Sequence, residues 1–197
     1  QRDRFASQME ALKRYGTAVS AETASPPDGT DRIAITFDDG FTSVVENALP
    51  VMAARGVPAT IFVTTGYLGA RAGWIVKQEH TNYHEVVLSA RQLQELPGDL
   101  VCIGSHGMLH RDLSRLTPDE ATAELGQSRE ELEAILNRPV RLLSLPYGGC
   151  SPAVLDLARK AGYERIFLNV PVDTAIAGGD DVVGRTNTTP DDWGLEF

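Results

Sequence analysis

Polar residues that can bind a metal follow short apolar segments of the sequence. Asp38 and Asp39 come directly after residues 32–37 (RIAITF), and His106 and His110 follow residues 100–104 (LVCIG). Adjacent carboxylates at the end of a buried strand repel each other unless a cation or hydrogen bonds offset their charge. Two imidazoles three residues apart can bind one ion, and two histidines with one carboxylate leave coordination positions open for water. The pattern predicts a hydrolytic metal site.

Each of these motifs also has a simpler interpretation. An Asp-Asp-Gly sequence after a strand is often only a turn. A pair of histidines with this spacing is weak evidence alone, because His80 and His84 have the same spacing as His106 and His110. We favour the later pair because it follows a predicted strand, whereas the earlier pair lies in a segment without periodicity.

Strand and helix patterns alternate along the chain, which predicts a mostly parallel α/β fold beginning near residue 32. Apolar, β-branched runs predict strands at residues 32–37, 59–63, 100–104, 142–145, 166–169 and 182–186. Helical spacing and capping residues predict helices at residues 42–55, with a kink at Pro50, and at 89–96, 117–136 and 151–162. Residues 66–87 lack periodicity and are expected to form an irregular excursion beside a binding surface. Since side chains at the carboxyl ends of parallel strands converge on one face, the motifs should meet there.

Composition limits the class of protein. A chain of 197 residues that is 42% hydrophobic and 23% charged fits one globular domain. We expect residues 1–30 to be a polar lead-in and residues 31–197 to form the catalytic domain. A net charge of −9 and a pI near 4.9 disfavour nucleic acid as a partner. No apolar run approaches the roughly 18 residues of a membrane span, and the chain shows no signal segment.

Three motifs in this order resemble those of one family. TFDDG (residues 36–40), SHGMLH (105–110) and LPYGG (145–149) are similar to the motifs of the polysaccharide deacetylase family, also called NodB-homology domains or carbohydrate esterase family four. The resemblance extends from about residue 32 to residue 185. It implies a distorted (β/α) barrel that removes N-acetyl groups from an N-acetylglucosamine-containing polysaccharide outside the cytoplasm. Two alternatives stay open: an esterase that removes O-acetyl groups from xylan or another glycan, and a carbohydrate-binding module with a relic site.

The resemblance also implies roles for individual residues. Asp39, His106 and His110 would bind a divalent metal, usually Zn²⁺, with Co²⁺ or Ni²⁺ as alternatives. Asp38 would be the general base that takes a proton from the attacking water. The backbone N–H of Tyr147 would stabilise the developing oxyanion.

The sequence departs from the family pattern at two places. Many relatives begin the third motif with an arginine that orients the base, but Leu143 or Ser144 stands there in this chain, and Arg185 could supply the contact from the last predicted strand. Many relatives also carry a late leucine-and-histidine motif that supplies the general acid. No histidine follows His110, so the acid is unassigned. A segment loosely similar to the family's Asp-Trp element contains Asp191, Asp192 and Trp193.

Overall fold

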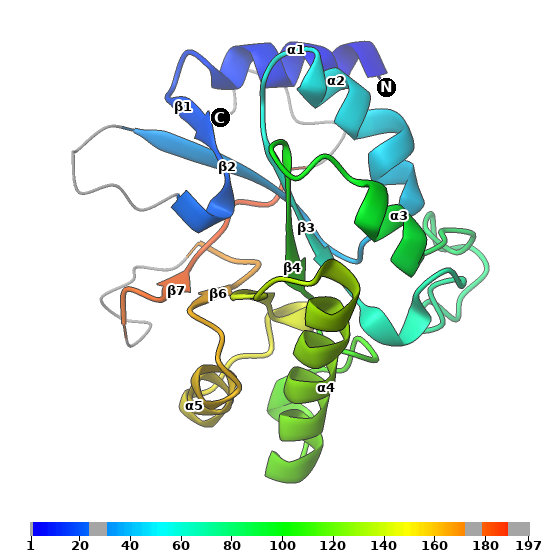
Figure 1. Ribbon diagram of the computed structural model, residues 1–197, viewed down its shortest axis with the longest axis vertical. Coiled ribbons are helices and arrows are strands. Elements are labelled where there is room, and N and C mark those ends of the chain that lie inside the picture. The colour runs from blue at the N-terminus through cyan, green and yellow to red at the C-terminus, as the bar shows by residue number, and fades with distance from the viewer. Residues whose placement is uncertain (1, 24–30, 172–178, 189–197) are drawn as a thin grey trace.

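A single sheet of parallel strands forms the centre of the protein. The computed structural model describes residues 2–23, 31–171 and 179–188. Along the sheet, the strands follow chain order: β1 (Thr17–Val19), β2 (Arg32–Phe37), β3 (Ala59–Val63), β4 (Val101–Ser105), β5 (Leu142–Ser144), β6 (Arg165–Phe167) and β7 (Val182–Val183). Every pairing is parallel, and the sheet curls into a half-barrel (Figure 1). The expected distorted (β/α) barrel is confirmed.

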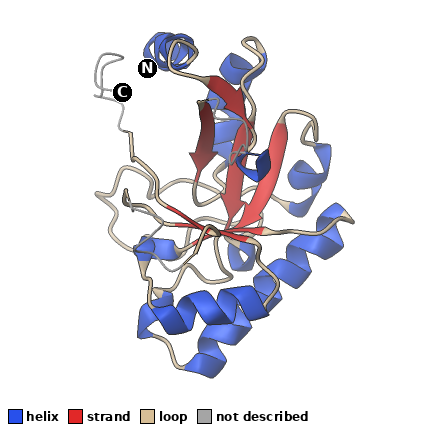
Figure 2. Cartoon of the chain, turned by 90° about the vertical axis from the view of Figure 1, so that its left-hand side faces the viewer, coloured by secondary structure: helices blue, strands red, loops and turns tan. Residues whose placement is uncertain are grey.

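The α-helices pack around the outside of the curled sheet (Figure 2). The α-helices are α1 (Arg2–Leu12), α2 (Leu49–Ala53), α3 (Ala90–Glu95), α4 (Pro118–Leu136) and α5 (Pro152–Lys160). Helix α1 packs beside α2, whereas α4 packs against α3 and α5 (Figure 1). Strands β3 and β4 are buried at every position. Side chains on one face, such as Ile61 and Ile103, belong to the main core, and those on the other face, such as Phe62 and Cys102, belong to a second apolar cluster. None of the helices that the structure describes is both long enough and apolar enough to cross a bilayer.

The sheet begins earlier in the chain than the sequence indicates. Strand β1 pairs with β2, with Thr17 opposite Arg32, and the Phe5 ring of α1 lies 6.4 Å from the Phe37 ring of β2. The predicted start of the fold near residue 32 was therefore too late. The reason is physical, because a strand of three residues is too short to show an alternating pattern.

The helix predicted at residues 42–55 is present but interrupted. Its first part, η2 (Val44–Ala48), is a π-helix in which the Leu49 N–H donates to the Val44 carbonyl, and α2 follows. Pro50 has no N–H to donate to the preceding turn, and a wider turn accommodates this loss. The expected kink thus takes the form of a π-helical turn before the proline.

Capping residues begin the other helices where the sequence predicts. Ser89 forms a capping box with Gln92 at the start of α3, and Thr117 forms one with Glu120 at the start of α4. Ser151 caps α5. The two late strands are shorter than predicted, since β6 pairs with β5 at three positions and with β7 at two.

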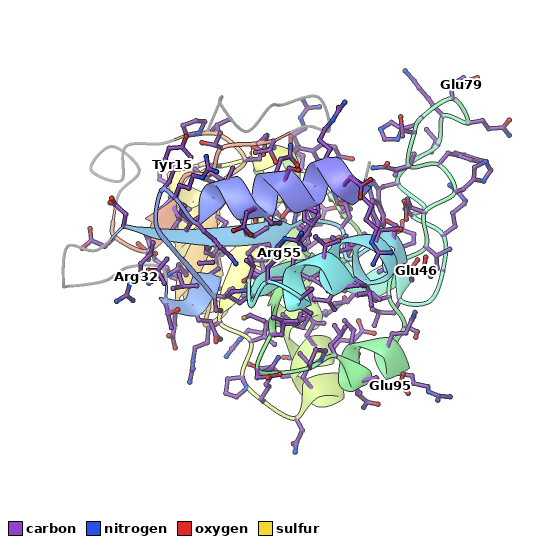
Figure 3. The ribbon with its side chains drawn as sticks, turned by 90° about the horizontal axis from the view of Figure 1, so that it is seen from above. Tyr15, Arg32, Glu46, Arg55, Glu79 and Glu95 are labelled. Atoms are coloured by element: carbon purple, nitrogen blue, oxygen red, sulfur yellow. The ribbon has the colours of Figure 1, made fainter. Side chains whose placement is uncertain are left out.

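The excursion predicted at residues 66–87 is irregular but anchored. It begins in the short 3₁₀ helix η3 (Thr65–Tyr67), and its return is bridged to the chain after β2 at Phe41 and Val87. The Leu88 N–H also donates to the Gly40 carbonyl at 2.8 Å. Glu79 lies far out on the excursion (Figure 3). The base of the excursion is therefore fixed to the loop that carries Asp39.

Candidate active site

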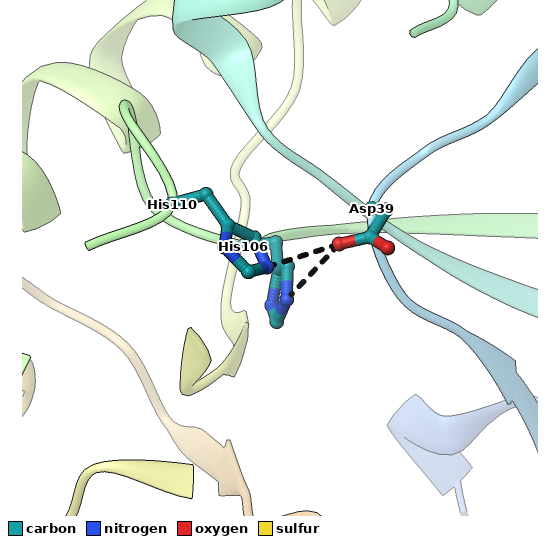
Figure 4. A group of neighbouring side chains, drawn as sticks. All are labelled: Asp39, His106 and His110. Carbon is teal, nitrogen blue, oxygen red and sulfur yellow. Dashed lines mark ion pairs between the residues drawn. The ribbon is translucent and has the colours of Figure 1, made fainter. Parts of the chain in front are cut away.

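Three side chains from two strand ends face one another. Asp39 follows β2, and His106 and His110 follow β4. One oxygen of Asp39, Oδ1, lies 3.1 Å from Nε2 of His110 and 3.6 Å from Nε2 of His106 (Figure 4). The structure thus brings together the three residues predicted to be metal ligands. His80 and His84 lie elsewhere, exposed in the excursion.

The surroundings of His106 suit a metal ligand. Its ring is almost completely buried, and Nδ1 lies 2.8 Å from the Ser144 carbonyl oxygen, which orients Nε2 toward Asp39. Burial lowers the pKa of His106 below its ordinary value, and this effect outweighs the opposing effect of the Asp38 carboxylate. A neutral imidazole with its other nitrogen bonded to a carbonyl is the form that binds a metal.

Asp38 lies beside this cluster and pairs with Arg185. Two parallel hydrogen bonds of 2.8 and 2.7 Å join the guanidinium to the two carboxylate oxygens. Burial acts to raise the pKa of Asp38, but His106 and the two bonds from Arg185 hold it below its ordinary value. Because burial keeps His106 neutral, we attribute this lowering to Arg185. Asp38 is therefore an ionised carboxylate beside the cluster.

The Arg185 side chain is itself fixed by three further groups. It donates to Thr36 Oγ1 at 3.0 Å, to Ser144 Oγ at 2.8 Å and to the Leu168 carbonyl at 2.9 Å. Ser144 stands in the region where the resemblance to the family leads us to expect an arginine. In this chain the arginine is Arg185, which follows β7 and donates a hydrogen bond to the Ser144 hydroxyl. The small serine side chain leaves room for this guanidinium.

Backbone strain is concentrated at the site. Among the described residues, four that are not glycine have positive φ, and one of them, Asn137, ends α4 as its C-cap. The other three are Asp39 (φ 72°), His110 (φ 56°) and Tyr147 (φ 59°). Such conformations cost about 1–3 kcal/mol each and are often found at functional sites. Tyr147 is 60% exposed, and its ring packs edge-on against His110 at 4.7 Å.

Helix α4 holds the loop between the two histidines. Buried Glu124 accepts hydrogen bonds from the Met108 and Leu109 N–H groups at 2.9 and 2.8 Å. One turn further along the helix, Ser128 Oγ lies 2.5 Å from Ser105 Oγ at the end of β4. The sequence analysis missed Glu124. A carboxylate on the apolar face of α4, next to Leu125, was the available signal, since buried charges require a partner.

Aromatic rings form the wall beside His110. The Trp74 indole stacks on the His110 ring at 4.5 Å with planes 10° apart, and Phe41 and Tyr67 pack on Trp74. Trp74 belongs to the excursion and was not assigned from the sequence. Its position places part of the excursion against one of the three candidate ligands.

The donor set fits a divalent metal. The ligand atoms of Asp39, His106 and His110 all lie within 4.8 Å of one another, and both histidines are buried. Two imidazole nitrogens and one carboxylate oxygen are the donor set of catalytic zinc sites, which keep further positions open. These residues could therefore hold a metal ion at the carboxyl end of the sheet. Asp191, Asp192 and Trp193 lie outside the described residues.

Comparison with known proteins identifies the family. The family model for polysaccharide deacetylase matches residues 25–166. A putative polysaccharide deacetylase, YxkH of Bacillus subtilis, is 27% identical over 84% of this chain and 54% of its own length. A poly-beta-1,6-N-acetyl-D-glucosamine N-deacetylase of Staphylococcus aureus is 26% identical over 68% of this chain and 46% of its own length. The chain thus spans about half the length of these relatives.

Solved structures share the fold. The deacetylase PplD of Streptococcus pyogenes, in complex with acetate, aligns with a TM-score of 0.81 at 22% identity, covering 99% of this chain and 84% of that one. IcaB from Ammonifex degensii aligns with a TM-score of 0.79 at 24% identity, covering 100% of this chain and 88% of that one. The matched residues 25–166 are most of the sequence and contain all three motifs. The chain belongs to the polysaccharide deacetylase family.

Proposed function

We propose that this protein is a metal-dependent hydrolase that removes N-acetyl groups from an N-acetylglucosamine-containing polysaccharide. The observation that carries the proposal is the division of labour between two adjacent carboxylates. Asp39 faces the two histidines, whereas both oxygens of Asp38 are bonded to Arg185. This arrangement supports a role as metal ligand for Asp39 and as general base for Asp38.

The proposed ligands are Asp39, His106 and His110, and the ion is Zn²⁺, with Co²⁺ or Ni²⁺ as alternatives. Such an ion polarises a carbonyl and lowers the pKa of water to about 7. We assign the remaining chemistry to residues of the chain.

Asp38 accepts the proton of the attacking water as the water oxygen bonds to the acetyl carbonyl carbon. It then relays this proton to the amide nitrogen as the carbon–nitrogen bond breaks, which leaves acetate and a free amine. Arg185 holds the carboxylate in place during both transfers. The backbone N–H of Tyr147 stabilises the oxyanion.

The choice of substrate is supported by two relatives. One is a poly-beta-1,6-N-acetyl-D-glucosamine N-deacetylase and another, 28% identical over 86% of this chain, is a chitin deacetylase of Pestalotiopsis. Both act on polymers of N-acetylated sugar. With such a substrate, we also propose that the protein acts outside the cytoplasm.

Acetate release tests the proposal. The purified protein, treated with chelator and then supplied with Zn²⁺, Co²⁺ or Ni²⁺, should release acetate from poly-N-acetylglucosamine or chitin oligomers, and chelator alone should abolish this release. Parallel assays on O-acetylated xylan separate amide from ester hydrolysis. A protein that binds one equivalent of metal but releases acetate only from xylan would overturn the substrate assignment. A protein that neither binds metal nor releases acetate would be a module with a relic site.

A further inference from the structure

The two histidines of the proposed metal site are held in different ways. His106 is fixed by a polar contact, because its Nδ1 lies 2.8 Å from the Ser144 carbonyl oxygen. Nδ1 of His110 is buried and has no hydrogen-bond partner among the residues that the structure describes. A histidine that binds a metal almost always uses its second ring nitrogen for a hydrogen bond, which sets the orientation of the ring. Another contact must therefore orient His110.

That contact is an indole ring. Trp74 stacks face to face on His110, with ring centroids 4.5 Å apart and planes 10° apart. We propose that Trp74 is a positioning residue for His110, replacing the hydrogen bond that usually orients such a ligand. This inference rests on the proposed metal site, because it concerns how one of its ligands is held.

The stack restricts the one rotation that matters for binding. The imidazole of His110 turns about its Cβ–Cγ bond, and this torsion has broad energy wells. With the indole lying parallel at 4.5 Å, a large turn would drive the ring edge into Trp74. On another side, the Tyr147 ring meets His110 at 4.7 Å and 79°. Nε2 is thereby kept toward Asp39 Oδ1, 3.1 Å away.

Trp74 can serve this purpose because its own ring is supported. Phe41 stacks on it at 6.1 Å with planes 10° apart, and Tyr67 meets it edge-on at 5.1 Å. Gly73 allows Tyr67 to approach, since a Cβ atom at this position would lie 2.3 Å from the Tyr67 ring. Ala72 and Ile75, on either side, are buried. The indole is thus part of a packed group and not a mobile surface ring.

The stack gives the excursion a role at the proposed metal site. The excursion is anchored to the loop that carries Asp39, through the bridge between Phe41 and Val87. Through Trp74 it also contacts His110, which comes from a different strand end. One segment therefore braces ligands that arise from β2 and from β4.

Fluorescence can detect the contact without changing Trp74. The chain has two tryptophans, so Trp193→Phe leaves Trp74 as the only indole. Co²⁺ bound by His110 should quench this fluorescence by energy transfer, and quenching should saturate at the same concentration as the visible absorption band of Co²⁺. If Co²⁺ binds with one equivalent and the fluorescence is unchanged, Trp74 does not lie against the ligand and the inference is wrong.

Substitution tests whether the contact matters. Trp74→Ala should weaken Co²⁺ and Zn²⁺ binding by about 10-fold, the lower end of the loss found when the groups that orient metal ligands are removed, and should alter the Co²⁺ absorption band. Trp74→Phe keeps a flat ring and should restore most of the affinity. Val76→Ala is the matched control, since Val76 lies on the same segment and is 76% exposed; it should bind like the parent.

The outcomes separate this inference from the proposed function. If the parent binds no Co²⁺, the metal site itself is wrong and the inference falls with it. If the parent binds Co²⁺ and Trp74→Ala binds it equally well, with an unchanged band, only the positioning role is wrong. Equal losses in Trp74→Phe and Trp74→Ala would also contradict a role that depends on a stacked ring. Urea unfolding of each metal-free variant identifies any loss of affinity that merely follows from unfolding.

Discussion

Replacing Asp38 by asparagine separates the two adjacent carboxylates of the proposed site. Both oxygens of Asp38 are bonded to Arg185, at 2.8 and 2.7 Å, whereas the carboxylate that contacts the two histidines is Asp39. Asparagine has the same shape and keeps one acceptor for Arg185, but it cannot take up a proton. Loss of a general base costs about 10²–10⁴-fold in rate, or about 3–5 kcal/mol in barrier height. We expect a loss of this size in kcat for acetate release.

The same substitution should cost stability but leave the metal in place. One charge-assisted hydrogen bond to Arg185 is lost, and such bonds contribute about 1.5–3 kcal/mol. Because the Asp38 side chain is 30% exposed, we expect the lower part of this range in the free energy of unfolding, measured with urea. Zn²⁺ affinity, measured by calorimetry, should stay close to that of the parent.

Asp39→Asn is the matched control. Asparagine tolerates the φ of 72° at this position, so the backbone is not strained, but the only charged ligand is lost. We expect this variant to lose both Zn²⁺ binding and acetate release. Equal losses of metal in Asp38→Asn and Asp39→Asn would refute the assignment of base and ligand.

Three further predictions concern α4. Glu124→Ala leaves two N–H groups of the loop between the histidines without an acceptor and should cost about 2–4 kcal/mol in the free energy of unfolding. Glu124→Gln keeps an acceptor and should cost about 1 kcal/mol. Glu130→Ala, at an exposed position of the same helix, is the control, and equal effects at both positions would contradict the role of Glu124. Thr117→Ala removes an N-cap and should cost about 1 kcal/mol in urea unfolding; no change would show that the cap is dispensable. Bonds from Thr117 and Arg111 lower the pKa of Glu120 from 4.5 to about 2, so its contribution to stability should be complete above pH 4.5 and disappear as the pH falls toward 2. Glu120→Gln should remove that part of the acid dependence, and an identical pH profile would contradict this reasoning.

Most of the fold could be predicted from local patterns. Capping residues such as Thr117 and Ser89 mark helix starts because their side chains satisfy backbone N–H groups, which is a local effect. Strand β1 was missed because its three residues form no pattern, and its strand character comes from pairing with β2. The π-helical turn before Pro50 was only partly predicted: the sequence shows that a hydrogen bond is lost, but not how the neighbouring turn adjusts.

Some residues of the candidate site could be predicted from the sequence and others could not. Asp38, Asp39, His106 and His110 each follow a strand, so the parallel topology alone places them together. Trp74 could not be assigned, because it lies on an irregular segment whose path depends on packing against the rest of the chain. Contacts of this kind depend on tertiary structure, which periodicity does not describe.

The position of Arg185 shows why roles in this family need geometric support. An orienting arginine must place two N–H groups against the two oxygens of the base, and any backbone position from which the guanidinium reaches them meets this requirement. Here the guanidinium comes from beyond β7 and donates to Asp38 and Ser144 together. Ser144 Oγ accepts from Arg185 while its carbonyl oxygen contacts His106. A single residue thus links the proposed base to a proposed metal ligand.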